Sequence, residues 1–204
     1  MALASIVTPT IPGREHLLLD RCIPSVRTQT WPSVEHVIVS DRNSGLAEKV
    51  AGLPGLRFAE INETWRDGIQ ELSTGAIPWR VGSLLALGEF VGFLGDDDEL
   101  LPDHVERHVT AMTETGADFT VSSVQFRVAG QDRFVIGDNS FAHGHLDSDG
   151  IMCRAGSLLV ATWSPDSNNA ADAQLVADWL HAGLKGHFLG GLPTAVHHDG
   201  WASR

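Results

Sequence analysis

The 204-residue chain carries 26 acidic and 14 basic side chains, and its formal net charge is −12. Its 43% hydrophobic and 20% charged residues are typical of a globular protein, and the length suits a single domain over residues 1–204. The acidic balance disfavours nucleic acid as a partner, because an acidic field repels phosphate backbones. A partner that carries phosphate should therefore be small, with a metal ion neutralising its charge.

The cysteines and the apolar segments indicate where the protein resides. Cys22 and Cys153 lie far apart without metal-ligand spacing, so we interpret both as core residues in a reducing compartment. Residues 1–10 lack the basic and apolar regions of a signal peptide. The longest apolar zone, residues 83–95, is too short to span a bilayer. We therefore expect a cytoplasmic protein without a transmembrane segment.

The first half of the chain alternates strand and helix patterns. Short runs of branched apolar residues predict strands, and the four-residue spacing of Leu18, Cys22 and Val26 predicts a helix that Pro24 should kink. Strand, helix and strand in this order open a parallel α/β sheet. The expected elements are strands at residues 3–8, 34–40 and 56–61 and helices at residues 14–29, 45–51 and 77–87.

A cluster of acids follows the next strand. Residues 90–94 form an apolar run of strand length, which stops at Asp96, Asp97 and Asp98. Three adjacent carboxylates repel one another unless a cation lies among them, and their oxygen atoms suit Mg²⁺ or Mn²⁺. The simpler interpretation is an acidic turn that caps the helix beginning near Pro102, and both interpretations stay open here.

The second half is expected to continue with helices and strands. The segment at residues 141–150 carries His143, His145, Asp147 and Asp149; these side chains can ligate a metal, although loops also gather them without function. The expected elements are a helix that ends at Gly116, strands at residues 118–128 and 133–136 paired across a turn, a strand turning into a helix at residues 151–161, a helix at residues 172–182, and strands at residues 187–189 and 194–196.

Four segments resemble the family 2 glycosyltransferases of the GT-A fold, and they occur in that family's order. The segments are SIVTPT, VEHVIVSD, LGEFVGFLGDDDELLPDHVERHV and ADAQLVADWLHAGLKGHFLG. The resemblance implies an α/β, Rossmann-like fold with a mostly parallel central sheet, flanking helices and a small antiparallel C-terminal portion. It further implies a nucleotide-binding half at residues 1–100 and an acceptor-side half at residues 101–204.

The resemblance also implies how the donor, a nucleotide-diphosphate sugar, is bound. Donors of the family lie across the carboxyl ends of the strands, as ligands do in open α/β sheets. The matching residues here are Thr8, Pro9 and Thr10 for the base, Asp41 for the base or ribose, and Asp96 for the ribose. Arg80 is a further candidate for the diphosphate, although exposed helix arginines are common.

The metal site and the general base are implied in the same way. Asp97 and Asp98 match the metal-binding element for Mn²⁺ or Mg²⁺, and His198 is the tail histidine best placed to complete it. The family commonly has an acid where this chain has Gly95, so the choice of ligand among the three aspartates stays open. Asp172 matches the catalytic base, although Ala171 replaces the acid that usually precedes it.

We therefore expect an inverting, metal-dependent glycosyltransferase that moves a sugar to an acceptor hydroxyl, with Asp172 as the general base. Without a membrane segment, the expected acceptor is a soluble small molecule. Two alternatives remain: Gly95 is compatible with an inactive nucleotide-sugar binding module, and metal-binding acids also occur in nucleotidyltransferases. The latter usually carry a basic glycine-rich loop after the first strand, of which residues 11–14 are a poor version.

Overall fold

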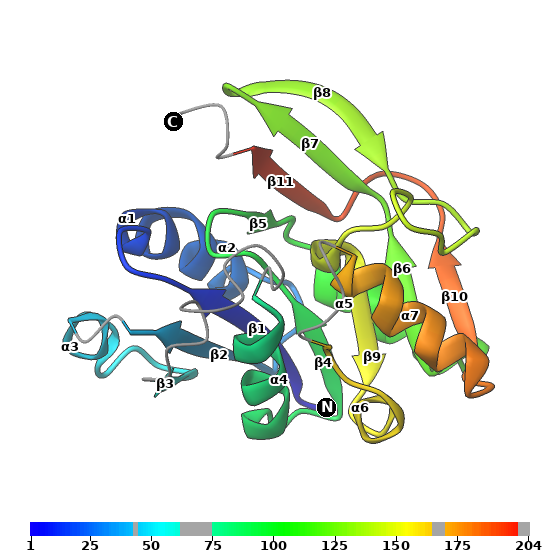
Figure 1. The fold of residues 1–204 in the computed structure, drawn as a ribbon, viewed down its shortest axis with the longest axis horizontal. Coiled ribbons are helices and arrows are strands. Elements are labelled where there is room, and N and C mark those ends of the chain that lie inside the picture. The colour runs from blue at the N-terminus through cyan, green and yellow to red at the C-terminus, as the bar shows by residue number, and fades with distance from the viewer. Residues whose placement is uncertain (43–44, 62–74, 165–169, 200–204) are drawn as a thin grey trace.

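A computed structural model describes residues 1–42, 45–61, 75–164 and 170–199. Its main sheet has seven strands in the order β10-β6-β9-β4-β1-β2-β3 (Figure 1). β9 runs antiparallel to both of its neighbours, and the other pairs are parallel. The strands are β1 (Ala4–Thr10), β2 (Val34–Asp41), β3 (Leu56–Ile61), β4 (Phe90–Phe93), β6 (Phe119–Ser122), β9 (Ile151–Arg154) and β10 (Gly186–Leu189).

A second sheet of four strands lies beside the carboxyl end of β6 (Figure 1). Its order is β5-β11-β7-β8, in which β11 and β7 are parallel and the outer pairs are antiparallel. The strands are β5 (Glu99–Leu100), β7 (Val124–Val128), β8 (Gln131–Ile136) and β11 (Ala195–Asp199). The predicted α/β fold, with its mostly parallel sheet and small antiparallel portion, is confirmed.

Helices cover both faces of the main sheet. One face packs against η1, α2, α3 and α5, and the other packs against α4 and α7. The helical segments are α1 (Glu15–Leu17), η1 (Leu18–Cys22), α2 (Ile23–Arg27), α3 (Leu46–Val50), α4 (Ala76–Leu85), α5 (His104–Thr115), η2 (Ser148–Gly150), α6 (Ser157–Val160) and α7 (Ala171–His181). Among these described helices, none is long and apolar enough to cross a membrane.

Strand β1 illustrates how the two cores form. Alternate side chains of a strand point to opposite faces, so Ile6 joins the cluster under η1 and α5 while Val7 joins the cluster under α4. Helix α4 approaches β1 closely because residue 82 is a glycine; a Cβ there would overlap Cγ1 of Val7. The carboxyl ends of β1, β2 and β4 are thereby fixed at one edge of the sheet.

The expected helix at residues 14–29 is interrupted. Between α1 and α2 the chain forms η1, a π-helical segment that ends at Cys22, immediately before the first turn of α2. Pro24 lies in that first turn. Proline lacks an N–H and clashes with the carbonyl one turn earlier, and the wider π turn accommodates it. The expected single helix is thus divided just before Pro24 by a π-helical segment.

The expected strand at residues 118–128 is wrong as a single element. It divides at Ser123: β6 belongs to the main sheet, while β7 belongs to the second sheet. Ser123 accepts a hydrogen bond from the backbone N–H of Thr194 at 3.0 Å, where the two sheets diverge. The apolar alternation shifts by one residue at the division, from positions 119 and 121 to positions 124, 126 and 128. Such a shift moves the apolar side chains to the other face of the strand, and it coincides with the change of sheet.

A buried polar network fixes the start of β11. Nδ1 of His104 lies 2.8 Å from the hydroxyl of Thr194, and that hydroxyl lies 2.6 Å from the hydroxyl of Ser122. His108 adds contacts of 2.8 Å to Thr120 and 3.1 Å to Ser122. Buried polar groups are costly to leave unpaired, so this network holds α5, β6 and the approach to β11 in one arrangement.

Candidate active site

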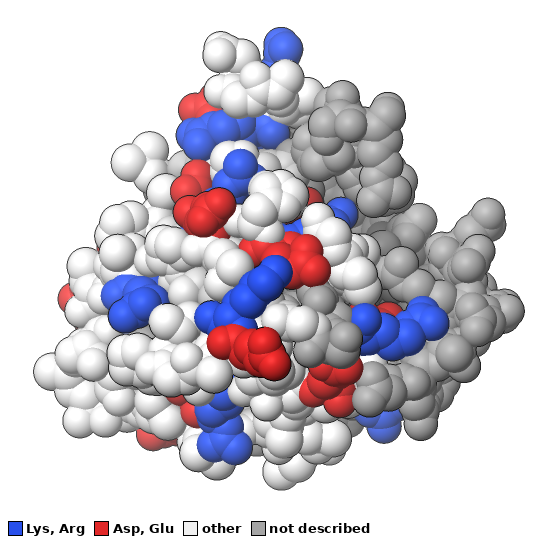
Figure 2. All heavy atoms as spheres, turned by 90° about the vertical axis from the view of Figure 1, so that its left-hand side faces the viewer, with Lys and Arg blue, Asp and Glu red and all other residues white. Residues whose placement is uncertain are grey.

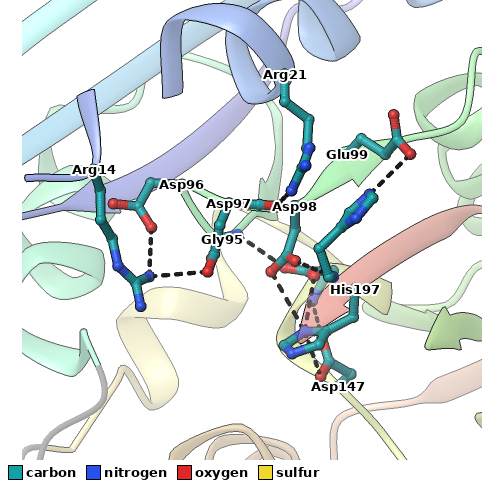
Figure 3. Close-up of polar contacts among 11 residues, drawn as sticks. Arg14, Arg21, Gly95, Asp96, Asp97, Asp98, Glu99, Asp147 and His197 are labelled. Carbon is teal, nitrogen blue, oxygen red and sulfur yellow. Dashed lines mark hydrogen bonds and ion pairs between the residues drawn. The ribbon is translucent and has the colours of Figure 1, made fainter. Parts of the chain in front are cut away.

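The acidic turn after β4 divides into two sides. Arg14 approaches from the segment before α1, and its Nη1 lies 2.9 Å from Oδ1 of Asp96 and 3.2 Å from Oδ2 of Asp97 (Figure 3). The hydroxyl of Thr10 donates to Asp96 at 2.8 Å, and Arg21 donates to the backbone carbonyl of Asp97 at 2.6 Å. Two arginines and a threonine therefore hold Asp96 and Asp97.

Asp98 turns to the other side, where it meets residues far away in the sequence. Oδ1 of Asp98 accepts the backbone N–H of His198 at 2.6 Å, and Oδ2 lies 3.4 Å from Nδ1 of His197. The same nitrogen lies 3.5 Å from a carboxylate oxygen of Asp147 and 3.6 Å from one of Asp149. Strands β4, β9 and β11 thus bring three carboxylates around one imidazole (Figure 3).

Gly95 explains how Asp149 reaches the acidic turn. The Gly95 N–H donates to Oδ1 of Asp149 at 2.9 Å, and the Asp149 N–H donates in turn to Asp147 at 2.9 Å. A Cβ at residue 95 would overlap Oδ2 of Asp98. The glycine that departs from the common family motif therefore leaves room for Asp98 and supplies the backbone donor for Asp149.

The pKa shifts at this corner reflect several carboxylates crowded around one imidazole. Burial raises the pKa of Asp98 well above its usual value, and the neighbouring Asp149 raises it further. Burial, together with Asp149, also raises the pKa of Asp147 to about 7. Burial alone would lower the pKa of His197, but Asp149 and Asp147 outweigh it and raise that pKa to about 9. Clustered carboxylates of this kind are stabilised by a cation.

The donor atoms fit a divalent cation. One ligand atom each of Asp98, Asp149 and His197 lies within 4.8 Å of the other two. Asp149 is fully buried, and both its Oδ2 and Nδ1 of His197 lack a hydrogen-bond partner. Unpaired buried polar atoms call for an explanation, and a shared metal ion supplies one. Carboxylate oxygens with an imidazole nitrogen suit Mn²⁺, or Mg²⁺ with fewer protein ligands.

The structure brings only part of the sequence-predicted metal set into this cluster. Asp98 belongs to it, Asp97 is paired with Arg14, and His198 faces Glu99, with Nε2 3.0 Å from Oε1. His197 takes the place at the cluster because adjacent residues of a strand point to opposite faces. The sequence also predicts a candidate metal-binding loop at residues 141–150, and Asp149 of that loop accepts the Gly95 N–H at 2.9 Å.

The predicted general base, Asp172, lies in the first turn of α7 and accepts the N–H of Ala173 at 2.7 Å. Burial raises its pKa, and the negative charge of Asp149 raises it further. His143 opposes the shift. Asp172 therefore lies within electrostatic range of Asp149 and His143.

The predicted nucleotide-binding residues lie along the carboxyl ends of β1 and β2. Thr10 contacts Asp96, while Asp41 is largely buried beside Arg42, whose Nε lies 3.2 Å away. The Thr8 side chain is buried, and its hydroxyl lies 2.8 Å from Nε2 of His36, so only its backbone faces the edge of the sheet. Two further predicted contacts are half-buried Pro9 at the end of β1 and exposed Arg80 on α4.

The surface charges of the described residues are mixed in sign (Figure 2). On the face shown in Figure 2, acidic and basic side chains of the described residues are interspersed, and no continuous basic stripe is visible among them. Proteins that bind nucleic acid usually gather Lys and Arg into such a stripe. The net charge of −12 is likewise unlike the basic balance of such proteins.

The main sheet and the acids at its carboxyl edge define a nucleotide-sugar transferase fold of the GT-A class. The sequence model of the family "Glycosyl transferase family 2" matches residues 5–159, which is more than half of the chain. The chain therefore belongs to glycosyl transferase family 2. A comparison with curated proteins found no match.

Solved structures confirm the fold. The 1-349 portion of S. aureus TarS, in complex with UDP, superimposes with a TM-score of 0.72 at 16% identity, covering 96% of this chain and 60% of TarS 1-349. A complex of the same portion with UDP-GlcNAc gives 0.73 at 16% identity, covering 97% and 58%. The Pyrobaculum calidifontis mannosyltransferase PcManGT, in complex with GDP-Man and Mn²⁺, gives 0.71 at 14% identity, covering 96% and 56%. The chain thus spans less than two thirds of these proteins.

One prediction concerns the glycine of the acidic turn. Replacing Gly95 with alanine should displace the Asp98 carboxylate and weaken Mn²⁺ binding, with a cost in folding stability of about 1–3 kcal/mol from overpacking. Titration of free Mn²⁺ by electron paramagnetic resonance measures the affinity. Gly156→Ala is the matched control, because a Cβ at residue 156 meets open space. Unchanged Mn²⁺ affinity in Gly95→Ala would show that the position of Asp98 is irrelevant to the metal.

Proposed function

We propose that this chain is a metal-dependent glycosyltransferase that transfers a sugar from a nucleotide-diphosphate sugar to an acceptor hydroxyl, with inversion at the anomeric carbon. The observation that carries the proposal is the meeting of Asp98, Asp149 and His197 at the carboxyl edge of the sheet, with Asp172 in electrostatic contact. Membership of glycosyl transferase family 2 supports it. In open α/β sheets this edge is where ligands bind.

Asp98, Asp149 and His197 would hold the cation. They combine two buried carboxylates with an imidazole, and two of their buried polar atoms have no other partner. A bound divalent cation there supplies positive charge for the diphosphate leaving group. The structure of the mannosyltransferase PcManGT contains Mn²⁺, which supports the proposal that this chain binds Mn²⁺ or Mg²⁺.

Asp96 and Asp97 would serve the donor side of the turn. Asp96 is fixed by Thr10 and Arg14, which leaves carboxylate lone pairs for ribose hydroxyls. Arg14 also holds Asp97 apart from the metal cluster. We assign the nucleotide base and the ribose to the backbone at residues 8–10 and to Asp41. Nucleotide binding would then belong to residues 1–100, and acceptor binding to residues 101–204. The diphosphate would meet Arg80.

Asp172 would act as the general base. A carboxylate accepts a proton more readily when partial burial raises its pKa, as it does for the half-buried Asp172. It would take the proton of the acceptor hydroxyl as that oxygen attacks the anomeric carbon from the side opposite the diphosphate. A single displacement of this kind inverts the configuration. The acceptor that we propose is a small molecule carrying a hydroxyl group.

Thermal unfolding with nucleotide diphosphates tests the donor and metal parts of the proposal. With UDP or GDP at about one hundred times Kd plus Mn²⁺, stabilisation should reach about 2.7 kcal/mol, or roughly 5–10 °C in Tm for a chain of this size. The Asp98→Asn variant should lose the Mn²⁺-dependent part of the shift. No shift with UDP, GDP or dTDP would contradict donor binding.

Reaction products separate the alternatives. A transferase should release nucleotide diphosphate from the donor when Mn²⁺ is present, even slowly and without acceptor, whereas an inactive binding module should only bind. Mass spectrometry of the products would reveal a nucleotidyl adduct if the chain were a nucleotidyltransferase. Donor binding with no turnover at all would contradict the transferase proposal.

A further inference from the structure

Three rings form a row across the second sheet. The register pairs His197 of β11 with Phe126 of β7, and Phe126 with Phe134 of β8. The His197 and Phe126 rings stack with centroids 4.4 Å apart and planes 22° apart. The Phe126 and Phe134 rings stack with centroids 4.8 Å apart and planes 14° apart. Direct cross-strand neighbours on one face of a sheet make such contacts.

The Phe126 ring contacts the face of the His197 imidazole, which, within the described chain, lacks the hydrogen bond that usually orients a metal-binding histidine. A histidine that ligates a metal usually donates its second ring N–H to a carboxylate or carbonyl, which fixes the orientation of the ring. Among the residues that the structure describes, no hydrogen bond holds either ring nitrogen of His197, and the 3.4–3.6 Å contacts of Nδ1 are longer than hydrogen bonds. The stacked Phe126 ring is therefore the contact that defines the plane of the imidazole.

Phe134 contributes little to the core. Its side chain is 53% exposed, and residues 131–135 of β8 are all exposed. A large apolar ring on an exposed strand needs a reason, and here it covers the face of Phe126 opposite His197. The Phe134 ring thus backs the aromatic stack, whereas Val124, Phe126 and Ile136 of the same hairpin pack in or against the core.

We propose that Phe126, backed by Phe134, is a positioning residue that fixes the His197 imidazole with Nδ1 toward Asp98 and Asp149. The inference rests on the metal site of the proposed function. With the ring held in this plane, the cation meets a preorganised ligand; without Phe126, binding must first restrict the rotation of His197. The aromatic stack thereby sets the affinity for the divalent cation.

The test uses Mn²⁺ affinity, which does not depend on turnover. Phe126→Leu, which keeps an apolar side chain but removes the ring, should weaken Mn²⁺ binding by about 10–100-fold, the range for contacts that orient a ligand. Phe126→Tyr retains the ring and should bind Mn²⁺ as the wild type does. Phe134→Leu should also weaken Mn²⁺ binding, but by less than Phe126→Leu does. Because the Phe134 side chain is exposed, this variant should fold.

A double-mutant cycle separates positioning from a general structural effect. In a His197→Gln background, Phe126→Leu should have no further effect on Mn²⁺ affinity, because the group that it orients is absent. An equal loss in both backgrounds, or an unchanged affinity in Phe126→Leu, overturns the proposal.

Nuclear magnetic resonance of the metal-free protein gives an independent readout. The stacked Phe126 ring should shift the His197 ring protons upfield, and Phe126→Leu should remove that shift. If the wild type shows the shift but binds no Mn²⁺, the orientation of His197 stands, while the metal site and the effect on affinity are overturned. If the shift is absent, positioning by Phe126 is overturned even where Mn²⁺ binds.

Discussion

Replacing Asp172 with asparagine should lower kcat for sugar transfer by about 10²–10⁴-fold, the usual contribution of a general base. The amide has nearly the same shape as the carboxylate but cannot accept the proton of the attacking hydroxyl. Oδ1 of Asp172 accepts the N–H of Ala173, and the amide oxygen can retain this contact, so α7 should keep its first turn. Initial rates at saturating donor and acceptor measure the effect.

A second acid of the same helix provides the control. Asp178 lies on α7 six residues after Asp172 and accepts an exposed hydrogen bond from Gln174 at 2.8 Å. Asp178→Asn should therefore keep kcat, and both variants should bind nucleotide diphosphate with wild-type affinity. Full transfer activity in Asp172→Asn, with donor binding intact, would refute its assignment as the base.

Replacing Asp98 with asparagine should abolish tight Mn²⁺ binding and most of the transfer activity. Asp98 supplies a buried carboxylate to the cluster, and loss of a direct ligand should cost more than the about 10–100-fold that loss of a supporting contact costs. Removing one negative charge should also relieve the repulsion with Asp149. Asp98→Asn therefore should not lower Tm in the metal-free protein, although it weakens the metal complex.

Asp97→Asn distinguishes the cluster seen in the structure from the assignment based on sequence. Asp97 pairs with Arg14, so its replacement should weaken Mn²⁺ binding much less than Asp98→Asn does. Isothermal titration calorimetry with Mn²⁺ on both variants gives the comparison. A larger loss of Mn²⁺ affinity in Asp97→Asn than in Asp98→Asn would identify Asp97 as the metal ligand. It would contradict the division of the acidic turn.

The fold could be predicted from the sequence because local patterns carry most of it. Apolar runs and four-residue spacings indicated the strands and helices, and the acids after residues 90–94 indicated the functional edge of the sheet. The crossing of the chain between sheets at Ser123 was missed, although the apolar alternation shifts by one residue there and could have indicated it. The order of the strands depends on long-range pairing, which no local pattern contains.

The candidate metal site in the structure differs in part from the set predicted from the sequence, for a related reason. His197 and His198 are adjacent in β11, and a shift of one residue in the register of a strand exchanges the faces on which they lie. The sequence contains both histidines but not that register. Asp149 reaches the turn because β9 pairs antiparallel with β4, and the backbone N–H of Gly95 then binds its carboxylate. The contact between Asp149 and Gly95 joins residues 54 positions apart.

Locating Mn²⁺ by anomalous scattering in crystals soaked with Mn²⁺ and UDP or GDP tests the central claim most directly. We predict a peak bonded to Asp98, Asp149 and His197, with diphosphate oxygens completing its coordination. A peak held by Asp97 or His198 instead, or no peak at this corner while nucleotide is bound, would contradict the account.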